Sequence, residues 1–134
     1  LHIREELSCS ETMLNAGNRA YGLHLPQAAL KLAAGFGGGM GIESTCGVIT
    51  GGILLLTSLF VEDKAHESEY LQELRGEYIE KFRSEFGTLE CKEIKERHRC
   101  PEGDCKPVIL EGARMLERII DRELGEHWSE NNRT

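Results

Sequence analysis

Apolar residues recur at intervals of three and four along much of the chain, which is the spacing of amphipathic helices. One such stripe predicts a helix over residues 68–86 that ends at Gly87, and another predicts a helix over residues 107–124. The first stripe is Leu71, Leu74, Tyr78, Phe82 and Phe86, and the second is Ile109, Ala113, Leu116, Ile120 and Leu124. Residues 45–61 are apolar on nearly every side, which predicts a central, buried helix.

Helix-start signals define the N-terminal part of the chain. Ser8 and Glu11 have the spacing of a capping box, which predicts a helix over residues 9–21 that stops at Gly22. Pro26 suits the first turn of a second helix over residues 26–34. A short helical piece is expected around residues 91–95, and no segment alternates strictly enough for a strand. We therefore expect an all-α bundle of about five helices, in one domain over residues 1–125 with a polar tail over residues 126–134.

Composition narrows the class of partner and compartment. The 134 residues carry a net charge of −7, which argues against a nucleic-acid partner. The apolar run at residues 47–61 is shorter than the roughly 20 residues needed to span a bilayer, and the first residues lack a signal-peptide pattern. The odd count of five cysteines favours a reducing cytoplasm. The apolar central helix is also compatible with a homodimer, so the sequence does not fix the oligomeric state.

Four cysteines lie near the boundaries of predicted elements: Cys9, Cys46, Cys91 and Cys105. Because they are far apart in sequence, only the fold can bring them together. Three of them, Cys9, Cys46 and Cys105, fall at predicted helix starts, where the helix dipole favours a thiolate and lowers a thiol pKa. Cys46 is the candidate nucleophile and Cys9 a candidate partner thiol.

A glycine-rich loop precedes the central helix. Its glycines do not fit the dinucleotide fingerprint, since Met40 and Ile42 stand where a third glycine is needed. The loop is either closely packed or directs backbone N–H groups at an anionic group such as a thiolate or a cofactor. The candidate cofactor-contacting glycines are Gly37, Gly38, Gly39 and Gly47.

The cysteine spacing limits the metal chemistry. Cys100 and Cys105 lack the second short-spaced pair of a self-contained zinc finger. The chain has no Cys-x-x-Cys and no Cys-x-x-Cys-His, which argues against a thioredoxin-like motif and against attached haem. His98 is the one histidine near a cysteine and is kept as a candidate ligand.

In order and spacing, Cys9, the glycine loop, the Cys46-Gly47-x-x-x-Gly51 motif, Cys91 and Cys105 resemble the C_GCAxxG_C_C family of small redox-active proteins. The resemblance implies that these four cysteines are the family's four and that the activity is redox chemistry. A related helical domain is joined to haem domains in split-Soret-type cytochromes, which favours electron transfer. Val48 departs from the family's Ala, and Cys100 is an additional cysteine.

Three functions remain open. The leading hypothesis is that Cys9, Cys46, Cys91 and Cys105 bind a two-iron iron–sulfur cluster that exchanges electrons with an unknown partner protein. The second is a metal-free thiol–disulfide enzyme or sensor, in which Cys46 attacks and another cysteine resolves. The third is a structural zinc site that attaches residues 91–105 to the bundle.

Overall fold

The computed structural model describes residues 7–61, 69–98 and 105–131, with side chains up to residue 125, and over these residues the fold is all-α. The helices are α1 (Cys9–Ala20), α2 (Gln27–Leu30), α3 (Gly47–Phe60), α4 (Glu69–Phe86), α5 (Cys91–Arg97) and α6 (Lys106–Asn131). A 3-10 segment, η2 (Lys31–Phe36), and a tight turn, η3 (Gly39–Glu43), join α2 to α3. The predicted fold class is therefore confirmed.

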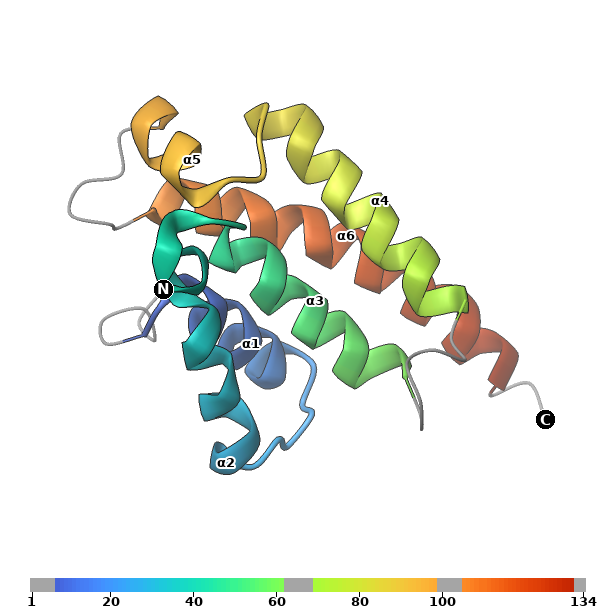
Figure 1. Cartoon of the computed structure of the whole chain (residues 1–134). Helices are drawn as coiled ribbons and strands as arrows, with labels where there is room; N and C mark the ends of the chain where they lie inside the picture. The colour runs from blue at the N-terminus through green and yellow to red at the C-terminus, as the bar shows by residue number, and fades with distance from the viewer. Residues whose placement is uncertain (1–6, 62–68, 99–104, 132–134) are drawn as a thin grey trace.

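Helix α3 occupies the centre of the bundle and contacts α1, α4 and α6 (Figure 1). Its residues Val48, Ile49 and Leu56 are almost inaccessible to solvent. A helix this apolar must be covered on several sides, since each buried aliphatic side chain contributes about 1.5–3 kcal/mol. The prediction of a central helix is confirmed.

Glycines on α3 let α1 approach very closely. A Cβ atom on Gly51 would lie 2.5 Å from the carbonyl oxygen of Ser10, and one on Gly47 would lie 3.1 Å from the Ser10 nitrogen. The Ser10 hydroxyl in turn donates a hydrogen bond of 2.7 Å to the carbonyl of Ala33, which fixes η2 against α1. This backbone-to-backbone packing holds the first turns of α1 and α3 side by side.

The predicted helix starts and stripes agree with the structure. Ser8 is the N-cap of α1 and forms the capping box with Glu11. The five residues of the α4 stripe are all buried. On α6, Ile109, Leu116 and Ile120 are buried, whereas Ala113 and Leu124 are partly buried against the core.

Most predicted helix boundaries agree with the structure to within about two residues, and two ends differ by more. Helix α6 continues past Leu124, its predicted end, through Gly125 to Asn131. Glycine lowers helix propensity by about 1 kcal/mol, which is too little to end a helix whose preceding turns are packed on the core. The second predicted helix becomes 3-10 from Lys31 onward.

Candidate functional site

The cysteine-bearing ends of four helices lie together at one end of the bundle (Figure 1). Cys9 is the first residue of α1, Cys46 is the N-cap of α3, and Cys91 is the first residue of α5. Cys105 directly precedes α6. The predicted position of cysteines at helix starts is therefore confirmed, and Cys91 joins the other three there.

A single cavity of about 100 Å³ is lined by all four of these cysteines. Its remaining wall consists of Ser8, Gly38, Gly47, Ile94 and Lys95. Cys46, Cys91 and Cys105 are 4%, 7% and 5% exposed, and Cys9 is half-buried. We call this space the cysteine cavity. The fold thus brings together residues separated by up to 96 positions in the sequence.

A short antiparallel contact sets the spacing between Cys46 and Cys91. Thr45 and Glu90, the residues just before them, form an isolated β-bridge. The Cys46 amide donates a 2.8 Å hydrogen bond to the Leu89 carbonyl, and the Cys91 amide donates one of 2.6 Å to the Ser44 carbonyl. Two backbone bonds therefore hold the start of α5 against the start of α3.

The glycine loop forms one wall of the site in an uncommon backbone conformation. Gly38, Gly39, Met40 and Gly41 all have positive φ, at 63°, 64°, 62° and 76°. Only glycine adopts this region without a steric cost, so three glycines here follow from the path of the chain. A Cβ on Gly39 would lie 2.8 Å from the Cys91 Cβ.

The predicted cofactor-contacting glycines have different roles. Gly38 and Gly47 line the cysteine cavity. Gly37 and Gly39 lie behind its wall: a Cβ on Gly37 would be 2.4 Å from the Ser8 Cβ, and Gly39 packs against Ser44 and Cys91. The loop is therefore closely packed, and one of its glycines also faces the cavity.

The pKa predicted for Cys46 is wrong in direction. Burial, together with the nearby Cys9 and Cys91 sulfurs, raises the pKa of the Cys46 thiol to about 12. The backbone amides of Val48 and Ile49, at the start of α3, lower this pKa as expected from the helix dipole, but burial outweighs them. The Cys46 side chain forms no capping hydrogen bond.

Lys95 was missed by the sequence analysis. It lies one turn after Cys91 on α5, lines the cavity and lowers the pKa of Cys91, whose net shift is upward because of burial. Its spacing of four residues from Cys91 was a usable signal, since such residues share a helix face.

Two other candidates do not reach the cavity or cannot be placed. His98 is the C-cap of α5 and packs edge-on against the Phe86 ring, with centroids 5.0 Å apart. It is not among the cavity-lining residues. Cys100 lies outside the described residues.

The oxidation states of the four cysteines differ. Cys9, Cys46 and Cys91 carry thiols, and Cys105 is disulfide-bonded. Within residues 7–61, 69–98 and 105–125, no three Cys, His, Asp or Glu side chains are arranged so that they could hold a metal ion. Over the same part of the chain, no helix is both long and apolar enough to cross a membrane.

Comparison with known proteins bears on the same residues. Residues 7–119 match the model of a family described as "Putative redox-active protein (C_GCAxxG_C_C)". This range contains the four cysteines of the cavity, the glycine loop and the motif that begins at Cys46. Searches of curated proteins and of solved structures found no match. Because the match covers most of the chain, the protein belongs to the C_GCAxxG_C_C family of redox-active proteins.

Proposed function

We propose that the cysteine cavity is a redox centre that holds an iron–sulfur cluster of the two-iron type and exchanges electrons with a partner protein. The observation that carries the proposal is that Cys9, Cys46, Cys91 and Cys105 line one cavity. Four cysteine thiolates are the usual ligand set of such a cluster. The cluster would supply one-electron chemistry, and the protein would supply its ligands and its surroundings.

The surroundings of the cavity suit a negatively charged group. The amides of Val48 and Ile49 act on the Cys46 sulfur, and Lys95, which lines the same space, acts through its charge on Cys91. Both stabilise thiolate sulfur, and hydrogen bonds and nearby charge are known means of tuning cluster potentials. Burial of three of the four cysteines would limit access of water and oxygen.

Binding would require a change at one cysteine. Cys105 would have to be reduced from its disulfide before it could act as a ligand. Four cysteines can hold either a two-iron cluster or a zinc ion, so the metal content of the purified protein decides between these two alternatives.

The test is the iron and sulfide content and the visible spectrum of protein purified without oxygen. We expect about two irons and two sulfides per chain, and we expect C46S and C105S to lose them. C100S is the matched control, because it removes the cysteine that is not one of the family's four. A protein without iron, or a C46S variant with an unchanged spectrum, would refute the proposal.

A metal-free thiol–disulfide function is the second candidate, and the disulfide at Cys105 favours it. In this chemistry a thiolate attacks one sulfur of a disulfide, a new S–S bond forms, and the other sulfur leaves as a thiolate. Cys9 is the better attacking group here, because it is half-buried whereas the Cys46 pKa is about 12. This reverses the roles expected from the sequence.

The metal-free function predicts a different result from the same preparation. Purified protein would contain no iron, and mild oxidation would remove two thiols per chain as two protons and two electrons leave to the oxidant. C9S should then slow exchange more than C46S. Equal rates for these two variants would contradict the assignment of Cys9.

A further inference from the structure

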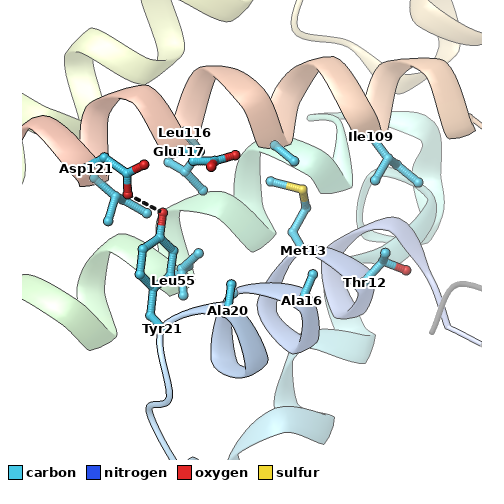
Figure 2. A pocket seen from close by; sticks show the side chains of 13 residues that line it. Thr12, Met13, Ala16, Ala20, Tyr21, Leu55, Ile109, Leu116, Glu117 and Asp121 are labelled. Atoms are coloured by element: carbon cyan, nitrogen blue, oxygen red, sulfur yellow. Dashed lines mark hydrogen bonds between the residues drawn. The ribbon is translucent and has the colours of Figure 1, made fainter. Parts of the chain in front are cut away.

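A second cavity, of about 370 Å³, lies between α1 and α6 with α3 as its floor (Figure 2). Pockets that bind small molecules have volumes of roughly 300–1,000 Å³ and mostly apolar walls. The side chains drawn from α1 point toward α6, and Leu55 of α3 lies behind them. We call this space the α1–α6 groove. None of the four site cysteines lines it.

The groove is long and narrow. Its wall on α1 runs from Thr12 to Ala20, and its wall on α6 runs from Ile109 to Asp121. At 1.5 Å per residue these spans are about 12 Å and 18 Å. A groove of this length with a volume of 370 Å³ is too narrow to enclose a helix, because a helix is about 10 Å wide. A linear chain fits this shape better than a peptide helix does.

The walls provide aliphatic contact and no aromatic platform. Met13, Ala16, Leu116 and Ile120 are among the apolar residues that line it, and Tyr21, at one end, is the single aromatic residue in the described part of its lining. Flat ring systems such as nucleotides and flavins are normally held by stacking or by several polar groups. An alkyl chain needs neither, because its binding energy comes from burial of methylene groups.

The polar end of the groove carries two carboxylates. Glu117 and Asp121 lie one turn apart on α6, both exposed at the mouth, and the Tyr21 hydroxyl donates a 3.1 Å hydrogen bond to Asp121 (Figure 2). Among the residues that the structure describes, no Lys, Arg or His lines the groove, so an anionic head group would be repelled. A cationic head group would meet two opposite charges.

We infer that the α1–α6 groove binds a linear amphiphile with an aliphatic chain and a cationic amine head group. The alkyl chain of the ligand would lie along α1 and α6, over Leu55 of α3. The ammonium would lie at the mouth, beside Glu117 and Asp121. This site is separate from the proposed redox centre and does not depend on it.

The first experiment is calorimetric titration with a series of n-alkylammonium chlorides, from hexyl to decyl, each kept below the concentration at which it self-associates. Affinity should rise about fourfold per methylene and stop rising once the chain fills the groove. Alkyl sulfates of equal length should bind more weakly, and added salt should weaken only the ammonium series. Equal binding of both series, or no binding of either, would overturn the inference.

Variants locate the binding. A16L fills the groove and should weaken binding about tenfold or more, whereas A28L adds the same side chain at an exposed position of α2 and should have no effect. E117Q and D121N should each weaken binding about two- to fivefold, with E73Q on the exposed face of α4 as the control. Circular dichroism checks that each variant is folded.

Unchanged binding in A16L would overturn the inference. So would a stable dimer that A16L converts to monomers, because the groove would then be a subunit interface.

Discussion

Replacing Gly51 by alanine should destabilise the protein, although alanine is the better helix former. In an open helix position this exchange stabilises by about 1 kcal/mol. At Gly51 the added Cβ would lie 2.5 Å from the Ser10 carbonyl oxygen and 2.8 Å from the Ser10 Cα. Both atoms belong to backbone within α1 and cannot rotate away.

The size of the effect follows from these contacts. Overpacking typically costs about 1–3 kcal/mol, and relief here requires α1 to move away from α3 as a unit. We expect G51A to lose about 1–2 kcal/mol of unfolding free energy after the gain in helix propensity is counted. Because Cys9 adjoins Ser10, the same movement should widen the cysteine cavity and speed alkylation of Cys46.

Gly76 provides the matched control. It lies in α4 and is exposed, and apart from its own helix no atom of the described residues lies within 4 Å of a Cβ built on it. G76A should therefore gain about 0.5–1 kcal/mol. Urea unfolding followed by circular dichroism measures both variants. If G51A proved as stable as G76A, the close approach of α1 and α3 would be refuted.

Three further predictions concern single interactions. Y78F should lower the free energy of unfolding by about 1 kcal/mol, measured by urea unfolding. The reason is that the buried Tyr78 hydroxyl donates a 3.1 Å hydrogen bond to the Gly112 carbonyl and lies 3.4 Å from the Val48 carbonyl oxygen. A variant of unchanged stability would refute this. The Arg122 guanidinium lowers the pKa of Glu77 to about 2 from 4.5, so the stability that this pair provides should be present above pH 4.5 and lost as the pH falls toward 2. R122Q should therefore be less stable than wild type at neutral pH and equal to it near pH 2, and a pH-independent difference would contradict this. In reduced, metal-free protein at pH 8, Cys46 should react with iodoacetamide far more slowly than Cys9, because burial raises the pKa of Cys46 to about 12. Mass spectrometry of the alkylated peptides measures both rates, and faster alkylation of Cys46 would refute this prediction.

The helices were predictable because their signals are local. The Ser8–Glu11 capping box and the five-residue stripe of α4 each depend on spacing within one or a few turns, and both are present in the structure. Gly47 and Gly51 carry a similar local signal, since glycines one turn apart leave a strip of helix without side chains, and α1 packs against this strip. The continuation of α6 past Gly125 was not predictable, because a helix end depends on tertiary packing as well as on propensity.

That the four cysteines come together could be predicted only from the family's motif. The contacts that join them connect residues far apart in the sequence, and no local pattern encodes these contacts. The β-bridge between Thr45 and Glu90 joins two segments 45 residues apart, and neither has the alternation of a strand. Likewise, the sequence places Cys46 at a helix start but does not show how deeply it is buried. The pKa of Cys46 was therefore predicted from the helix dipole, which lowers it, whereas burial, the larger effect, raises it.

The burial of Cys46 bears directly on the choice between the two proposed functions. A thiol that exchanges with other disulfides works best when its pKa is near the ambient pH and its sulfur is accessible. Cys46 has a pKa of about 12 and is 4% exposed, so it meets neither condition. A metal ligand has other requirements, because the metal replaces the proton and burial protects the bond. The backbone amides of Val48 and Ile49 at the start of α3 stabilise a bound Cys46 thiolate, and they leave its sulfur buried. In this chain, Cys46 is better suited to hold a cluster than to attack a disulfide.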